Sequence, residues 1–273
     1  MPVTLARGVL ATTLAACKPA EPRTHRTPAA AHAHPAPAPP PHSLLHRLGS
    51  PAPYDAPMTP DEVRARFARP PLPLPPPPAW LRPEHLPEGT PFERPAAPPD
   101  ARPAAALVLV YPGADGMAHV VLTQRVEYGA DHHSGEVSLP GGKADPDDAD
   151  AVATALREAE EEVGLDPDAA GVEVVGRLDA LWIPPSNFLV TPIVAIAARR
   201  PAFVPDPREV AAILEAPVTA FLPDVAPVIV DPDPRGRPLR YGAYLVDQRI
   251  VWGATAAILG QLGAVLGAAP GPE

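Results

Sequence analysis

Three glutamates, Glu158, Glu161 and Glu162, have the spacing in this sequence that is most suggestive of chemistry. If the stretch is helical, a rotation of about 100° per residue brings the three carboxylates to one side of the helix. Like charges three or four residues apart repel by a few tenths of a kcal/mol per pair, so this face implies a cation. Small and aliphatic residues fall on another side, about 140° away by the same geometry, and can be buried there: Val152, Leu156, Ala159 and Val163.

Oxygen ligands of this kind suit a hard divalent cation such as Mg²⁺, which binds through a few carboxylates together with substrate phosphates. A Pro-Gly-Gly turn at residues 140–142 lies upstream, and its backbone carbonyls are further candidate ligands. Such a metal would neutralise phosphate charge and help to deprotonate a water molecule. Cysteine and histidine do not recur at zinc-ligand spacings, so a zinc site is not favoured. The alternative is an acidic helix face that is simply solvated.

The elements around this helix predict an α/β fold with a mixed β-sheet between helices. The helix is expected to end at Gly164, because a glycine followed closely by a proline is a common stop. Pro192 is expected where a ladder hydrogen bond is missing. Apolar runs predict strands at 106–111, 119–125, 172–176, 188–197, 239–245 and 249–252, a helix at 253–266, and either a strand or a helix at 209–216.

Proline divides the chain, since 27 of its 45 prolines lie within residues 1–103. The Ala/Pro/His-rich residues 1–57 are expected to be a disordered tail, with histidines that are incidental rather than ligands. Residues 58–103 are expected to be a short helix and a proline-rich linker, acting as a spacer rather than as an SH3-type ligand. The folded domain is expected at residues 104–268.

Charge and cysteine content narrow the possible partners. A formal net charge of −10 does not favour binding to nucleic acid or to an anionic membrane. The single cysteine, Cys17, excludes an internal disulfide and suits a cytoplasmic protein. No apolar run reaches the roughly 18 residues of a membrane span. A short apolar stretch before Cys17 leaves a lipoprotein anchor as a minor alternative, and Met58 is an alternative start to Met1.

The helix and its flanks resemble the Nudix box: glycine, five residues, glutamate, seven residues, then R-E-U-x-E-E-x-G-U, where U is aliphatic. Residues 157–165 match the second half, with the small Ala159 at the first U. The first half departs, because Gly142 lies fifteen residues before Arg157, one more than the pattern has, and Ala149 stands at the glutamate position. Asp147 and Asp148 are both candidates to replace that glutamate.

Segments outside the box resemble the coenzyme A pyrophosphatase branch of Nudix hydrolases, over about residues 104–265. The loop before the box resembles L-L-T-x-R-S followed by H-x-G-x-V-x-F-P-G-G, with Val126 for serine, Leu139 for the aromatic residue, and one extra residue before His133. The branch's S-G-F-x-V-T-P, E-V, hydrophobic-P-L and I-W-G-x-T-A segments resemble residues 185–192, 209–210, 216–218 and 251–255.

The resemblance implies an α/β/α sandwich and assigns roles to individual residues. Glu158 and Glu162 would be the principal metal ligands, and Gly142 would contribute a carbonyl. Glu161 would be both a ligand and a catalytic carboxylate.

The remaining roles fall on residues around these ligands. Arg157 would hold a catalytic glutamate by a bidentate pair. Glu209 would be a catalytic carboxylate from outside the box. Arg125 and His133 would bind substrate phosphates, unless His133 only shapes its loop.

The implied reaction is Mg²⁺- or Mn²⁺-dependent hydrolysis of the pyrophosphate in coenzyme A or acyl-coenzyme A, giving 3′,5′-ADP and 4′-phosphopantetheine. The protein would be a monomer or a homodimer. The alternatives are a hydrolase for another nucleoside diphosphate derivative, such as ADP-ribose, NADH or an oxidised nucleotide, and a binding module without catalysis. Intact glutamates speak against the binding module.

Overall fold

The computed structural model describes residues 57–86, 88–91, 95–127, 135–231, 238–269 and 271, together with the backbone of 45–47. The expected disordered tail falls almost wholly outside these residues, and so does Cys17. In the described part of the chain, no helix has the length and apolar character that crossing a membrane requires.

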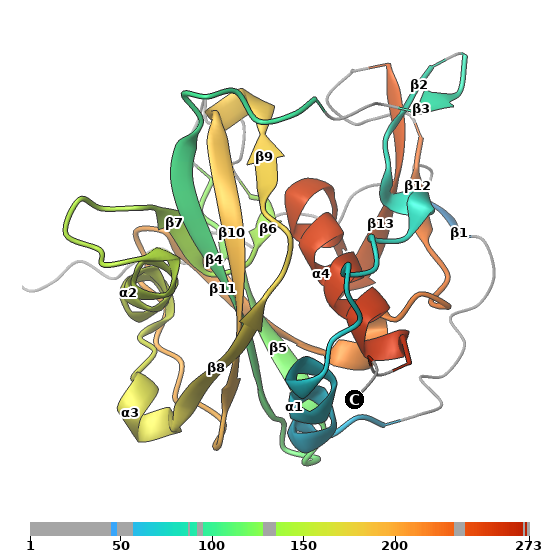
Figure 1. Ribbon diagram of the computed structural model, residues 1–273. Helices are drawn as coiled ribbons and strands as arrows, with labels where there is room; N and C mark the ends of the chain where they lie inside the picture. Colours follow the sequence, from blue (N-terminus) through green and yellow to red (C-terminus); the bar gives the residue numbers. More distant parts are fainter. Residues whose placement is uncertain are drawn as a thin grey trace, which may run out of the picture. The chain divides into compact units, whose positions relative to one another are not determined.

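A mixed sheet forms the centre of the domain, with the strand order β11-β5-β4-β10-β8 (Figure 1). Strands β4 (Arg102–Pro112) and β5 (Ala118–Arg125) form the expected hairpin, and β10 (Phe188–Ala197) runs parallel to β4. Residues 209–216, which left two alternatives open, form a strand, β11 (Val210–Pro217). Shorter partners complete the sheet: β6 (Val137–Ser138), β7 (Gly141–Lys143), β8 (Val172–Arg177) and β9 (Leu181–Ile183).

Helices cover both faces of this sheet, so the expected α/β/α sandwich with a mixed sheet is confirmed. Helices α2 (Ala151–Val163) and α3 (Pro167–Ala170) lie on one side, while α1 (Pro60–Ala68) and α4 (Gly253–Gly267) lie on the other (Figure 1). Short 3₁₀ turns connect the elements at η2 (Ala79–Leu81), η3 (Pro184–Ser186) and η4 (Val218–Phe221).

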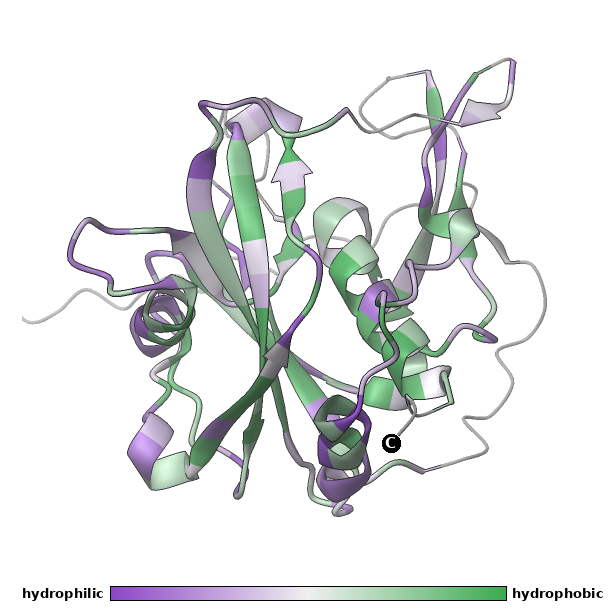
Figure 2. Ribbon diagram, viewed as in Figure 1, coloured by the Kyte–Doolittle hydropathy of each residue, from purple (hydrophilic) through white to green (hydrophobic). Residues whose placement is uncertain are grey.

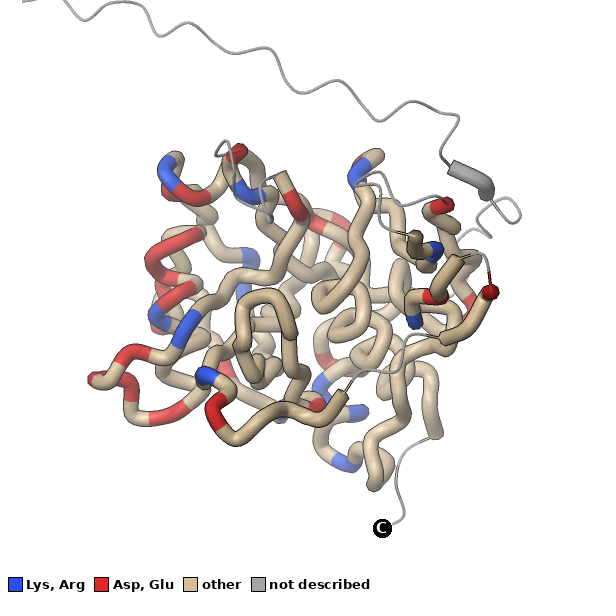
Figure 3. Tube along the Cα trace, turned by 90° about the horizontal axis from the view of Figure 1, so that it is seen from above, with Lys and Arg blue, Asp and Glu red and all other residues tan. Residues whose placement is uncertain are grey.

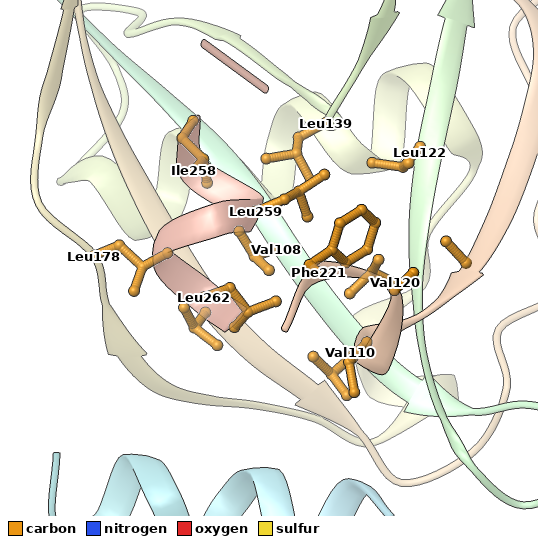
Figure 4. Packing of buried hydrophobic residues seen from close by; sticks show 14 of the residues in the cluster. Val108, Val110, Val120, Leu122, Leu139, Leu178, Phe221, Ile258, Leu259 and Leu262 are labelled. Atoms are coloured by element: carbon orange, nitrogen blue, oxygen red, sulfur yellow. The ribbon is translucent and has the colours of Figure 1, made fainter. Parts of the chain in front are cut away.

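Strand β4 shows why its sequence is apolar throughout rather than alternating. Its even-numbered residues from Ala104 to Val110 pack toward α4, and its odd-numbered residues from Ala105 to Tyr111 pack toward α2. Both faces of a central strand are covered, so every residue from Ala104 to Tyr111 is buried. Figure 2 shows hydrophobic residues along β10 and α4, which pack around this strand. On the α4 side, side chains from the sheet, η4 and α4 meet in one cluster that includes Val108, Val120, Phe221 and Leu259 (Figure 4).

Pro192 lies where the sequence predicted a break in the ladder. Strand β10 pairs with β9 through Phe188–Val190 and with β8 from Ile193 onward, so Pro192 falls between the two paired stretches. Its carbonyl accepts a hydrogen bond from the Leu178 N–H at 3.0 Å.

The short helix expected in residues 58–103 is present as α1, but the proline-rich stretch after it packs against the domain and is not a spacer. Helix α1 begins with a capping box at Thr59 and buries Val63 and Phe67 in the core. Farther along, the Pro75 carbonyl accepts a hydrogen bond from the Gln261 side chain of α4, and Trp80 packs edge-on against Tyr244. The apolar side chains among these prolines gain more from burial than an extended spacer would allow.

A second sheet has the strand order β1-β12-β13-β2-β3, with β14 also paired to β13. The expected turn after residue 245 is present, because Asp247 and Gln248 both have positive φ between β13 and β14, as a tight hairpin requires. The strands are β1 (Leu45–Arg47), β2 (Glu84–His85), β3 (Thr90–Pro91), β12 (Val228–Val230), β13 (Leu239–Val246) and β14 (Arg249–Val251).

Helix α4 approaches η4 so closely that Gly263 has no room for a side chain. A methyl group there would overlap the Phe221 carbonyl, which is backbone and does not move aside easily. We expect Gly263→Ala to lower the free energy of unfolding by about 2 kcal/mol, measured by urea denaturation. Gly267→Ala is the control, since its methyl group would meet only the Pro223 ring, at 3.1 Å, and should change stability by less than about 1 kcal/mol. Equal stabilities would contradict the close approach.

Candidate active site

Helix α2 is fixed at both ends by local signals in its sequence. The Asp150 carboxylate caps the start and accepts the N–H groups of Val152 and Ala153 at 2.8 and 2.9 Å. Gly164 ends the helix in the left-handed conformation, with φ of 65°. Ala155, Ala159 and Val163 are fully buried on the side that packs toward β4.

Arg157 contacts three acidic residues of α2 and the loop before it. Its guanidinium makes a bidentate pair with Asp148, with two N–H···O contacts of 2.9 Å. Its Nη1 also donates to Glu158 at 3.0 Å and to Glu161 at 3.1 Å, and its Nη2 donates to the Lys143 carbonyl. One cation therefore fixes two of the three helix carboxylates relative to the loop before the helix.

The bidentate partner of Arg157 differs from the glutamate that the resemblance implied. The partner is Asp148, whose side chain is only 7% exposed. Its hydrogen bonds with Arg157 hold the pKa of Asp148 well below its ordinary range. Asp148 rather than Asp147 thus occupies the place that Ala149 leaves vacant, because Ala149 and Asp147 are exposed.

Glu162 is a buried carboxylate at the centre of the site, with 3% of its surface exposed. The Gly141 N–H donates to its Oε2 at 3.2 Å, and Nη1 of Arg125 lies 3.8 Å from its Oε1. The pKa of Glu162 is raised from 4.5 to about 7, mainly by burial and also by the charges of Glu158 and Glu209. The Gly141 N–H and Arg125 act in the opposite direction and stabilise the charged carboxylate only in part.

Glu158 lies directly against the Gly-Gly turn. A Cβ atom at Gly142 would come within 2.5 Å of its carboxylate oxygen, so only glycine leaves room for this approach. Burial raises the pKa of Glu158, and the charges of Glu161 and Glu209 act in the same direction. The Gly142 backbone and the Glu158 carboxylate are therefore adjacent.

The structure brings together most of the residues that the sequence singled out. Figure 3 shows acidic segments gathered on the side of the domain where α2 and its preceding loop lie. Glu209, which is distant in sequence, is close enough for its charge to act on Glu158 and Glu162. His133 lies outside the described residues.

The donor set fits a hard divalent cation such as Mg²⁺. Carboxylate and carbonyl oxygens are its preferred ligands, and the incompletely compensated charge of Glu162 is what such a cation would neutralise. Within the described ranges, no three Asp, Glu, His or Cys side chains are already gathered closely enough to hold a metal ion. Arg157 instead engages Glu158 and Glu161.

Comparison with known proteins identifies the family. Residues 101–225 match the NUDIX domain model. An uncharacterized Nudix hydrolase, NudL, from Photorhabdus laumondii is 41% identical over 130 residues, covering 48% of this chain and 68% of that protein. The chain belongs to the Nudix hydrolase family.

Other relatives extend the comparison. Nudix hydrolase 22, chloroplastic, from Arabidopsis thaliana is 40% identical over 178 residues, which cover 62% of this chain. The match spans only 57% of that relative's length. A crystal structure of a Nudix hydrolase from M. smegmatis, RenU, aligns with a TM-score of 0.34 and 25% identity over 52% of this chain and 82% of that one. Family membership rests on the sequence matches.

The loop that carries Glu209 was not predicted from the sequence. Asp206 begins a turn there, and its carboxylate accepts the Arg208 N–H at 2.9 Å. The signal was present as Asp206-Pro207-Arg208, because aspartate followed by proline favours the start of a turn. The Asp-Pro-Arg sequence predicts a turn, but it does not predict that the turn packs against α2.

The position of Asp148 yields a test of the Arg157 network in this Nudix domain. We expect Asp148→Asn to lower the free energy of unfolding by about 1–2 kcal/mol, because an amide cannot replace both charge-assisted hydrogen bonds to Arg157. Asp147→Asn removes an equal charge from the same loop and should keep the wild-type stability. Equal stabilities of the two variants in urea denaturation would contradict the assignment.

Burial of Glu162 predicts a pH-dependent stability in metal-free protein. Its carboxyl has a higher pKa when folded than when unfolded, so the destabilisation is absent below pH 4.5 and grows as the pH rises to about 7. With EDTA present, Glu162→Gln should be more stable than wild type by up to about 3 kcal/mol at pH 8, and nearly equal to it near pH 4.5. Urea denaturation at both pH values measures this difference. The exposed Glu160→Gln should show none, and a constant gap for Glu162→Gln would contradict the prediction.

Proposed function

We propose that this protein hydrolyses the diphosphate linkage of a nucleoside diphosphate derivative with Mg²⁺ or Mn²⁺. The observation that carries the proposal is the carboxylate of Glu162, buried beside the Gly141 N–H and under the influence of the charges of Glu158 and Glu209. A protein keeps an incompletely compensated buried carboxylate at a cost in stability, and a divalent cation supplies a reason to keep it.

In this proposal, Glu158, Glu162 and Glu161 hold the metal together with the Gly142 carbonyl. The bound metal would supply charge neutralisation at the phosphoryl oxygens and a lowered pKa for water. Arg157, anchored by Asp148, keeps Glu158 and Glu161 in position and does not touch the substrate.

Two further residues act on the substrate side of the proposed reaction. Glu209 is exposed in the turn directly before β11, so its carboxylate is the candidate to accept a proton from the attacking water. The Arg125 guanidinium is 36% exposed beside Glu162, which suits a group that binds a substrate phosphate. His133 is proposed as a second phosphate ligand.

For the substrate, we propose coenzyme A or acyl-coenzyme A, cleaved to 3′,5′-ADP and 4′-phosphopantetheine. Support comes from segments outside the box that resemble the coenzyme A pyrophosphatase branch, in particular residues 133–142 and 185–192. The protein is proposed to act in the cytoplasm as a monomer or homodimer on this small molecule, without nucleic acid or membrane as a partner.

A substrate panel tests this function. Purified protein with Mn²⁺ is incubated with coenzyme A, acetyl-coenzyme A, ADP-ribose, NADH and 8-oxo-dGTP, and products are separated by chromatography. We expect 3′,5′-ADP from the two coenzyme A compounds at the highest kcat/KM. Preference for another compound would reassign the substrate, and no hydrolysis of any would favour a binding module.

A variant pair tests the metal assignment in the same assay. Glu162→Gln should lower the turnover rate by orders of magnitude, because it removes a ligand charge while keeping a similar shape. Glu160→Gln, which changes an exposed glutamate two residues away, should keep the wild-type rate. A near-normal rate for Glu162→Gln would overturn the assignment.

A further inference from the structure

The loop at residues 204–209 is bonded directly to the last turn of α2. The last four carbonyls of a helix have no partner within the helix and need one elsewhere. Here the Val204 N–H donates to the Val163 carbonyl at 2.8 Å, and the Asp206 N–H donates to the Glu162 carbonyl at 2.9 Å. The backbone of Glu162 and the start of the turn that carries Glu209 are therefore adjacent.

Asp206 shapes the turn between these two glutamates. Its carboxylate accepts the Arg208 N–H at 2.9 Å, and its carbonyl accepts the N–H groups of Glu209 and Val210 at 3.0 and 2.8 Å. At the end of the turn, the Glu209 carbonyl accepts the N–H of Val126, the residue after strand β5, at 3.0 Å. Glu209 is thus held on one side by the turn and on the other by the sheet.

From these contacts we infer that Asp206 is a positioning residue for Glu209, holding the Glu209 carboxylate over the Glu158–Glu162 pair. The inference rests on the proposed function, in which Glu209 takes part in hydrolysis. Asp206 acts through the backbone turn and does not touch the metal or the substrate. No motif of the sequence analysis assigned it a role.

Glu209 is positioned by the hydrogen bond that the Asp206 carboxylate accepts from the Arg208 backbone, and not by the ion pair between Asp206 and the Arg208 side chain. The Asp206 side chain is 16% exposed, whereas that of Arg208 is 83% exposed, and ion pairs in water contribute little to stability. The hydrogen bond that closes the turn comes from the backbone N–H of Arg208, which remains when the side chain is removed. An asparagine can also accept that hydrogen bond, whereas an alanine cannot.

Three variants separate these contributions in the hydrolysis assay. We expect Asp206→Ala to lower kcat by about 10- to 100-fold while KM changes less than about threefold, because a displaced Glu209 affects the reaction more than substrate binding. Asp206→Asn should restore most of the rate, and Arg208→Ala should stay near wild type. A wild-type kcat for Asp206→Ala, or an equal loss for Asp206→Asn, would overturn the inference.

Affinity for Mn²⁺ alone, measured by electron paramagnetic resonance, gives a readout that needs no substrate. Displacing Glu209 removes negative charge from the site, so Asp206→Ala should weaken Mn²⁺ binding as Glu209→Gln does, while Asp206→Asn and Arg208→Ala should not. If the wild-type protein hydrolyses no compound of the panel but the Mn²⁺ affinities of the variants differ as expected, the positioning role stands and the proposed function fails. If wild type is active but Asp206→Ala leaves both kcat and Mn²⁺ affinity unchanged, the positioning role fails and the function stands.

Discussion

The packing of helix α2 onto strand β4 is the contact on which the rest of the site depends. The small side chains of Ala155 and Ala159 lie buried on that face and let the helix approach the sheet closely. The same approach brings Glu158 against Gly142 and places Glu162 beside the Gly141 N–H. The strand, the glycine turn and the helix therefore form one rigid unit, and the carboxylates have the positions that this unit dictates.

Only a few arginine side chains balance the negative charge of the carboxylates in this unit. Arg157 satisfies Asp148, Glu158 and Glu161 together, whereas Glu162 has Arg125 only at 3.8 Å. A helix could avoid this cost by replacing Glu162 with an apolar residue, since buried ion pairs seldom stabilise a fold more than good apolar packing does. The arrangement is consistent with selection for a bound cation rather than for stability.

Much of the fold around helix α2 could be predicted from the periodicity and spacing of residues in the sequence. The longer strands, the end of α2 and the shared face of three glutamates follow from local patterns, and the structure confirms them. Asp148 could not be chosen over Asp147 from sequence, because one extra residue in the loop changes which side chain points inward. The burial of Val63, Phe67 and Leu81 was also out of reach, since a proline-rich composition gives no sign of the surface against which the segment packs.

The hydrogen bond between Pro75 and Gln261 joins residues that are 186 positions apart. Helix α1 and the prolines after it leave the ribosome well before α4, against which they pack. The β4–β5 hairpin and α2 involve nearer neighbours and can pair sooner, whereas the α4 face of the sheet stays uncovered until α4 emerges. Such distant contacts slow folding and prolong exposure of apolar surface. During synthesis, the apolar face of the sheet is therefore exposed to aggregation until α4 docks.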